Sequence, residues 1–312
     1  MKKYAVGVDI GGTTVKIGIF TSEGELITKW EITTRKDEGG KYILSDVAAS
    51  VEEKLSEQGI AKDDVAGVGM GVPGPVKEDG TVVKCVNLGW GIFNCEEELS
   101  KIIGLPVKAG NDANMAALGE AWQGGGKGYS NQVMVTLGTG VGGGIIIGGK
   151  MLSGTNGAGG EIGHICVNDD ETETCGCGKT GCLEQYTSAT GIVRAANKIL
   201  QASDKPSKLR SVQYISAKEI FDAAKEGDEL AGDLVEDHGK CLGKALAAIA
   251  AVVDPEVFVI GGGVSRAGEI LIDKTSKYFA QYAFHACKGT KFALATLGND
   301  AGIYGCAKAV LD

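Results

Sequence analysis

The chain has 312 residues, 43% hydrophobic and 23% charged, which is the balance of a globular protein with room for two domains. Its formal net charge of −9 argues against unspecific binding to nucleic acid or to an anionic membrane. No apolar run reaches the roughly 20 residues that a membrane-spanning helix needs, so neither nucleic acid nor membrane is expected as a partner.

The N-terminal part of the chain predicts a β-β-β-α-β unit. Three segments alternate or run apolar between turn residues and predict antiparallel strands at 4–10, 15–20 and 25–33. Apolar residues then recur at helical spacing over 41–57, and a short buried strand follows at 65–70.

The same order of elements recurs in the second half. It predicts strands at 132–137, 144–148 and 150–152, a long helix over 229–253 and a buried strand at 257–260. The segment 187–224 and the cysteine-rich loop before it are then insertions. Two such units facing each other across a cleft predict an α/β protein with a two-domain actin-like ATPase fold, ribonuclease H-like and of the hexokinase type.

The first glycine-rich loop, DIGGTTVK, lies between two predicted strands and is therefore a hairpin turn. The backbone N–H groups of Gly11, Gly12 and Thr13 can converge on a phosphate group there. Asp9 could hold a hydrated Mg²⁺ beside the phosphates, and Lys16 would add positive charge. The alternative is a plain β-hairpin without a ligand.

Two further glycine loops are phosphate or nucleotide candidates. Gly138, Thr139 and Gly140 begin a formal G-x-G-x-x-G, but a triple isoleucine follows where a dinucleotide-binding motif requires a helix. We therefore predict a second phosphate hairpin. Gly262 and Gly263 follow the strand 257–260 and either pass flat against a base or ribose or form a strand-to-helix turn.

A metal site is predicted from the spacing H-x10-C-x-C-x4-C. Three thiols and an imidazole, from His164, Cys175, Cys177 and Cys182, make a closed tetrahedral zinc set. The alternative is three unrelated buried cysteines. The other six of the nine cysteines are scattered and are expected to act as small apolar residues. Because the N-terminus resembles a strand more than an export signal, a cytoplasmic protein with reduced thiols is expected.

A catalytic carboxylate is predicted at Asp112, where a helix over 115–123 begins at the hinge between the two halves. It could accept the proton of a substrate hydroxyl during phosphoryl transfer, or it could merely cap the helix. A polyhydroxylated ring needs several carboxylate and amide acceptors. Candidates for these contacts are Asn87, Asn111, Asp112, Glu161 and Glu184.

Two aromatic side chains extend this prediction. His164 could give one ring nitrogen to zinc and offer the other N–H to a sugar hydroxyl. Trp90 either packs on a sugar face or belongs to the core. His238 and His285 are expected to be structural or surface residues.

Taken together, these motifs resemble the ROK family (repressors, open reading frames and kinases). The resemblance runs through most of the chain and rests on DIGGTTVK, GMGVPGPV, NLGW, NDAN, LGTGVGGG, GGEIGH, CGCGKTGCLE and IGGGVS. It implies an actin-like ATPase fold, ATP with Mg²⁺, a structural Zn²⁺, and phosphorylation of a hexose at its 6-hydroxyl with Asp112 as base. It also implies a homodimer or homotetramer.

The resemblance further implies a domain boundary and a substrate. The small N-terminal domain would span 1–112 and be completed by the last helix, about 299–312, and the larger domain would span 113–298. Family repressors carry a DNA-binding domain in front, for which the strand starting at Tyr4 leaves no room. The NLGW motif resembles the glucokinase branch, so glucose is the expected sugar. Another hexose, N-acetylmannosamine or fructose, and a non-catalytic sugar sensor remain the alternatives.

Overall fold

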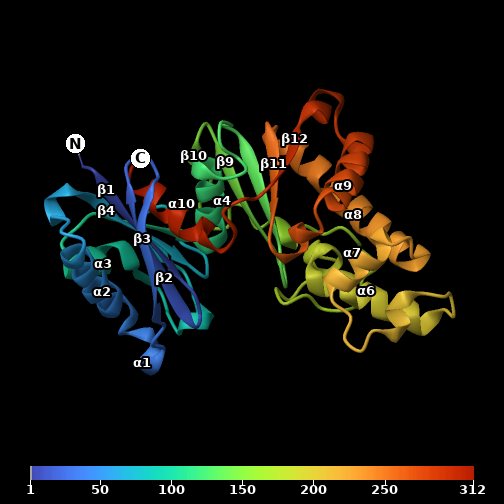
Figure 1. The fold of residues 1–312 in the computed structure, drawn as a ribbon, viewed down its shortest axis with the longest axis horizontal. Coiled ribbons are helices and arrows are strands. Elements are labelled where there is room, and N and C mark those ends of the chain that lie inside the picture. The colour runs from blue at the N-terminus through green and yellow to red at the C-terminus, as the bar shows by residue number, and fades with distance from the viewer. Residues whose placement is uncertain (1) are drawn as a thin grey trace. The chain divides into compact units, whose positions relative to one another are not determined.

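The computed structural model describes residues 2–312. It divides into two compact units, coloured along the chain in Figure 1. Unit 1 contains the chain up to Ser130 together with Gly144–Gly160 and Thr296–Asp312, and unit 2 contains Asn131–Gly143 and Glu161–Ala295.

Unit 1 is built on a five-stranded sheet in the order β3-β2-β1-β4-β7. The strands are β1 (Tyr4–Ile10), β2 (Thr14–Thr21), β3 (Leu26–Thr33), β4 (Val65–Val72) and β7 (Val107–Asn111). β1, β2 and β3 pair antiparallel, whereas β4 pairs parallel with β1 and with β7. The three predicted antiparallel strands and the buried strand after them are thus confirmed.

Helices cover both faces of this sheet. α2 (Ile43–Glu57) and α3 (Cys95–Ile103) share a core cluster with the sheet. α10 (Ala301–Ala309) lies close against the other face. A Cβ on Gly7 would lie 1.9 Å from the Ile303 carbonyl oxygen, and a Cβ on Gly69 would lie 1.7 Å from the Cys306 carbonyl oxygen. Glycine at these strand positions lets the helix backbone approach the sheet.

α4 (Asp112–Gln123) packs on α10 in unit 1. A Cβ on Gly119 would lie 2.1 Å from the Ala301 carbonyl oxygen, and one on Gly305 would lie 1.6 Å from that of Met115. Glycine on both helices therefore gives a close helix pair. The boundary predicted at residue 112 assigns α4 to the other domain, whereas its glycine face packs in unit 1.

The second sheet has the order β10-β9-β8-β11-β12. Its strands are β8 (Gln132–Leu137), β9 (Val141–Ile147), β10 (Lys150–Met151), β11 (Val257–Gly261) and β12 (Lys291–Leu294). β11 runs parallel to both β8 and β12. The second predicted strand begins at Val141 instead of Gly144, because glycines 142–144 are extended and belong to the strand.

The long helix α8 (Glu229–Val253) has the predicted bounds and packs on α9 (Glu269–Tyr282). Phe258 of β11 lies with its ring centroid 5.5 Å from that of Phe279 of α9, which joins the sheet to this helix. The inserted segment is largely helical, with α5 (Glu184–Thr187), α6 (Ala189–Ala202) and α7 (Ala217–Lys225).

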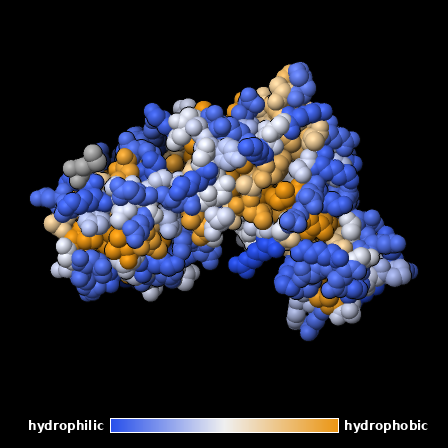
Figure 2. All heavy atoms as spheres, turned by 45° about the horizontal axis from the view of Figure 1, so that its top comes forward, coloured by the Kyte–Doolittle hydropathy of each residue, from blue (hydrophilic) through white to orange (hydrophobic). Residues whose placement is uncertain are grey.

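The remaining short elements are α1 (Asp37–Gly40), β5 (Thr81–Val82) and β6 (Phe93–Asn94). In residues 2–312 no helix is both long and apolar enough to cross a membrane. The face drawn in Figure 2 is mostly polar, and its apolar side chains gather in separate patches.

Candidate active site and metal centre

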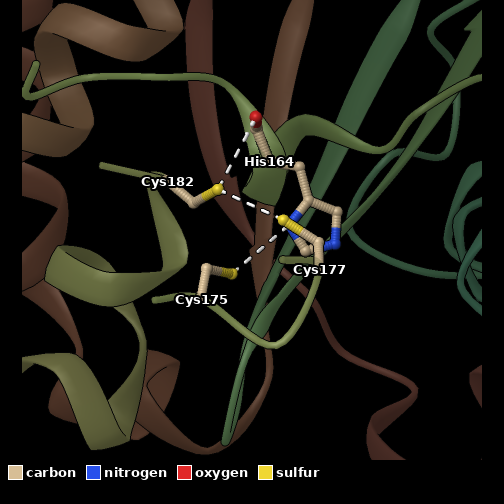
Figure 3. A group of neighbouring side chains, drawn as sticks. All are labelled: His164, Cys175, Cys177 and Cys182. Atoms are coloured by element: carbon tan, nitrogen blue, oxygen red, sulfur yellow. Dashed lines mark hydrogen bonds between the residues drawn. The ribbon is translucent and has the colours of Figure 1, made fainter. Parts of the chain in front are cut away.

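The four predicted metal ligands lie together in unit 2 (Figure 3). Their ligand atoms all lie within 4.8 Å of one another. The Cys177 and Cys182 sulfurs are 3.6 Å apart, and the Cys175 sulfur is 3.9 Å from Nδ1 of His164. Two thiolates on one tetrahedral zinc, each with a bond of about 2.3 Å, would be about 3.8 Å apart. The spacing and the donor types therefore fit a closed tetrahedral metal site.

Tight turns bring these ligands together. The Cys175 N–H donates to the Lys179 carbonyl oxygen at 2.7 Å, and the Gly178 N–H donates back to the Cys175 carbonyl oxygen at 2.9 Å. Gly178 has a φ of +88° and Gly181 one of +73°, conformations that favour glycine. The alternative of three unrelated cysteines is thereby excluded, since one small loop holds all three thiols.

Two glutamates lie on opposite sides of the His164 ring. Glu184 Oε1 is 3.8 Å from Nδ1, and Glu161 Oε2 is 4.0 Å from Nε2. Nδ1 therefore faces the thiols, and Nε2 is turned away from the cluster toward Glu161. Both glutamates border the metal loop, because Glu161 immediately precedes a 3₁₀ turn (Ile162–His164) and Glu184 begins α5.

The second glycine loop lies beside Glu184 in the same unit. The Val141 N–H donates to Glu184 Oε2 at 3.4 Å, and a Cβ on Gly140 would lie 2.6 Å from the same oxygen. The loop connects β8 to β9 as a hairpin, closed by a hydrogen bond of 3.0 Å from the Gly138 N–H to the Gly140 carbonyl oxygen. The strand β9 follows it, as predicted, in place of the helix that a dinucleotide-binding motif requires.

The start of α6 anchors this hairpin. The Ala189 N–H donates to the Gly138 carbonyl oxygen at 2.7 Å, and the Thr190 hydroxyl donates to that of Thr139 at 2.6 Å. Thr190 was not predicted as part of the site, and it lies some 50 residues from the loop it supports. No local pattern could have revealed this long-range contact.

The third glycine loop is a strand-to-helix turn that packs against the second. Gly262 has a φ of +83°, and a Cβ on it would lie 2.5 Å from the Leu137 carbonyl oxygen. Gly263 begins a 3₁₀ helix that ends at Ala267. Because β8 and β11 are parallel neighbours, the two loops leave the same edge of the sheet.

Unit 1 holds the first glycine loop. The Gly11 N–H donates to the Thr14 carbonyl oxygen at 3.0 Å, which closes the predicted hairpin. The buried Thr34 holds both sides of it, since its hydroxyl donates to the Gly11 carbonyl oxygen at 2.7 Å and its N–H to that of Thr13 at 2.9 Å. Thr34 was also missed, because it follows a strand whose sequence gives no sign of the loop beside it.

Asp9 and Asp112 flank the same glycine in unit 1. A Cβ on Gly71 would lie 3.5 Å from Asp9 Oδ1 and 3.7 Å from the Asp112 Cα. Burial, followed by repulsion from Asp112, raises the pKa of Asp9 to about 6, against an opposing effect of Lys16. Lys16 lies opposite Asp9 on β2 and donates from Nζ to the Asn299 carbonyl oxygen at 3.1 Å. A cation beside these carboxylates would offset their repulsion.

The helix cap beside them is Asn111. Its side-chain oxygen accepts from the N–H groups of Ala113 and Asn114, so Asp112 is the first helical residue instead of the cap. Asn111 Nδ2 donates to the Gly74 carbonyl oxygen at 3.2 Å. Asn111 is therefore the N-cap residue, although Asp112 Oδ1 also accepts from the Ala113 N–H, at 2.8 Å.

The other predicted side chains divide between surface and core. Asn87 is exposed, in a short 3₁₀ turn (Val86–Leu88). Trp90 is only 6% exposed and donates from Nε1 to the Gly40 carbonyl oxygen, so it belongs to the core. His238 is buried and His285 exposed, as predicted.

The expectation that all other cysteines act as small apolar residues is wrong for one of them. Cys85, Cys95, Cys287 and Cys306 are buried and Cys241 is half-buried, but Cys166 is exposed. Cys166 pairs across a β-bridge with the ligand Cys182, because the metal loop returns along its own entry strand at the surface.

The fold and these glycine loops define an α/β protein of the actin-like ATPase class, which confirms the predicted fold class. Residues 5–312 match the model of the ROK family, and the chain belongs to that family.

Three relatives illustrate the similarity. The chain is 44% identical to a glucokinase of Halalkalibacterium halodurans over 97% of this chain and 93% of that protein. It is 35% identical to a glucokinase of Thermotoga maritima, with 99% and 98% covered. The crystal structure of a ROK family glucokinase from Streptomyces griseus in complex with glucose and AMPPNP is 35% identical, with a TM-score of 0.74 and 98% of each chain covered.

Proposed function

We propose that this protein is an ATP-dependent glucokinase that phosphorylates glucose at its 6-hydroxyl. The observation that carries the proposal is the similarity over nearly the whole chain to glucokinases, one of them solved with glucose and an ATP analogue. The retained glycine loops and acidic pair are the parts that phosphoryl transfer needs.

Asp112 is the proposed general base. It accepts the proton of the glucose 6-hydroxyl as the bond between that oxygen and the γ-phosphorus forms, while the bond from the γ-phosphorus to the bridging oxygen breaks and ADP leaves. Its support is its place at the first turn of α4, beside Asp9. Asp9 is the proposed Mg²⁺ contact. When bound, Mg²⁺ would neutralise charge on the phosphates.

The proposed phosphate contacts are backbone N–H groups and hydroxyls of the glycine hairpins, helped by the charge of Lys16. The hairpin residues are Gly11, Gly12, Thr13, Gly138, Thr139 and Gly140, with Gly262 and Gly263 toward the nucleoside. Their support is the backbone geometry within each unit, where Thr34 and Thr190 hold the turns.

The proposed glucose contacts are the side chains that the sequence analysis singled out, namely Asn87, Asn111, Asp112, Glu161, His164 and Glu184. The direction of the His164 ring supports its part. With Nδ1 toward the thiols, Nε2 carries the proton and can donate to a sugar hydroxyl.

The metal of the four-residue cluster is proposed to be a structural Zn²⁺. Three thiolates and one imidazole leave no open coordination position, so its role is to fold the loop. The loop carries Glu184 and the His164 ring at a fixed orientation, which links the metal to glucose affinity. We further propose a cytoplasmic homodimer or homotetramer, as the family resemblance implies.

One assay tests the function. ADP release, coupled to an optical readout, is measured with glucose, fructose, mannose and N-acetylmannosamine as separate acceptors. We expect the highest kcat/KM with glucose. A higher value for another sugar would change the substrate, whereas thermal stabilisation by glucose without ADP release would identify a non-catalytic sensor.

A further inference from the structure

Glu120 on α4 is a carboxylate with 0% exposure that accepts hydrogen bonds from two distant backbone segments. Its Oε2 accepts from the Gly125 N–H at 2.8 Å and from the Thr296 N–H at 3.0 Å, and its Oε1 accepts from the Leu297 N–H at 2.8 Å. Its carbonyl oxygen also accepts from the Gly124 and Gly126 N–H groups. One residue thus holds five backbone N–H groups.

The chain is shaped to allow this arrangement. A Cβ on Gly124 would lie 1.9 Å from Glu120 Oε2, so a side chain there would displace the carboxylate. A buried carboxylate is costly unless donors surround it, and amide N–H groups meet that need with partial positive charge. The glycines at 124–126 therefore leave room for the Glu120 carboxylate and donate their N–H groups to Glu120.

The two segments that Glu120 holds adjoin two of the four places where the chain passes from one unit to the other. The chain leaves unit 1 after Ser130, a few residues beyond the glycines, returns to it for Gly144–Gly160, and re-enters it for the last time at Thr296. Thr296 and Leu297 are the first residues after that re-entry, and α10 begins shortly afterwards at Ala301. All five N–H groups and Glu120 itself belong to unit 1.

We infer that Glu120 is a positioning residue that anchors these two connecting segments to unit 1. The inference rests on the proposed function, in which residues of each unit take part in turnover. Loss of the Glu120 hydrogen bonds loosens two of the four connections at once, so it lowers turnover although Glu120 touches neither substrate. A role confined to stability would lower the melting temperature alone.

The test compares three variants of the full chain. Glu120→Gln keeps the size of the side chain but places an NH₂ group against backbone donors. Gly124→Ala leaves the carboxylate intact and displaces it. Asp228→Asn is the matched control, because Asp228 also accepts backbone N–H groups from two segments, those of Lys208 and Ala231, yet lies within unit 2.

Two readouts decide the outcome. In hydrogen–deuterium exchange without ligands, peptides containing Gly125, Thr296 and Leu297 should exchange at least tenfold faster in Glu120→Gln and Gly124→Ala, and at the wild-type rate in Asp228→Asn. The same two variants should lose about tenfold in kcat under conditions where all proteins are folded. The control variant should have a lower melting temperature than the wild type and an unchanged kcat.

Wild-type exchange rates in both connection variants would overturn the inference, as would an unchanged kcat with faster exchange. Failure of the proposed function is distinguishable, because the wild-type protein itself would then release no ADP with glucose. If Glu120→Gln does not fold, the result for Gly124→Ala alone decides the inference, because this variant retains the Glu120 carboxylate and changes only its position.

Discussion

At the scale of single residues, the acidic pair of unit 1 shows how position gives a side chain its chemistry. Asp112 follows directly after β7 ends, and the preceding Asn111 takes over the capping of α4. Asp112 is thus the first residue of the helix, and its Oδ1 accepts from the Ala113 N–H at 2.8 Å. A half-buried acid at a helix start beside a second acid is a candidate for proton transfer and cation binding.

Asp112→Asn tests the proposed base. The amide has nearly the same shape but cannot accept the hydroxyl proton, so we expect kcat to fall by roughly 10²–10⁴-fold. Glucose affinity, measured by calorimetry, should change far less. Retention of near-wild-type kcat would exclude Asp112 as the base.

His238 gives a prediction about pH. Burial lowers its pKa to about 4, although Nε2 lies 2.9 Å from the Thr187 carbonyl oxygen. If Nε2–H donates there, Nδ1 is unprotonated, and among residues 2–312 it has no hydrogen-bond partner. Protonation would place a second N–H beside the ring of Phe221, which packs on the imidazole.

The folded protein therefore binds fewer protons than the unfolded chain between about pH 4 and the ordinary histidine pKa near 6.5. The stabilising contribution is complete above about pH 6.5 and is lost as pH falls through about 4, by at most about 3 kcal/mol. Urea unfolding of wild type and His238→Gln across this range should show a shallower pH dependence in the variant. His285→Gln, at an exposed position, should retain the wild-type dependence.

At the scale of elements, a loop of tight turns and a helix pair lined by glycines make different demands on the chain. Residues 166–181 of the metal loop are mostly exposed or half-buried, and tight turns bring its donor side chains together. The packing of α10 on the sheet and on α4 depends instead on glycines, which have no side chain at the points where two backbones approach each other.

Cys177→Ser should remove the metal and weaken glucose binding together. Loss of one thiolate leaves three ligands, so the zinc content by plasma mass spectrometry should fall from about one per chain toward zero. Cys166→Ser is the matched control, since Cys166 is exposed and adjoins the loop without belonging to the cluster. Full glucose affinity in metal-free Cys177→Ser would separate the metal from the proposed sugar site.

Gly69→Ala should destabilise unit 1 strongly. The added methyl would lie 1.7 Å from the Cys306 carbonyl oxygen, and α10 would have to move away from the sheet. Overpacking of this kind costs about 1–3 kcal/mol or more. Gly232→Ala on α8 is the control, because nothing lies within 4 Å of its Cβ and alanine favours a helix. Equal unfolding free energies for the two variants would contradict the close packing of α10.

At the scale of the whole molecule, the sequence was most informative where period and spacing carry the signal. α8 has the predicted bounds because a long amphipathic pattern marks a helix, and the first three strands pair as predicted because short turns leave little choice. The short β12 and the α4–α10 pair were not predicted. They rest on contacts between segments far apart in the chain, which a local pattern does not encode.

The four predicted metal ligands lie together as their spacing predicted, because three of the four donors belong to one short loop of tight turns. The tertiary structure decided which residues support the functional loops. Thr34, Thr190 and Glu120 act on partners that are distant in sequence, and each looks like an ordinary polar residue in its own segment. It also decided that Trp90 belongs to the core, since burial depends on what the rest of the chain packs against it.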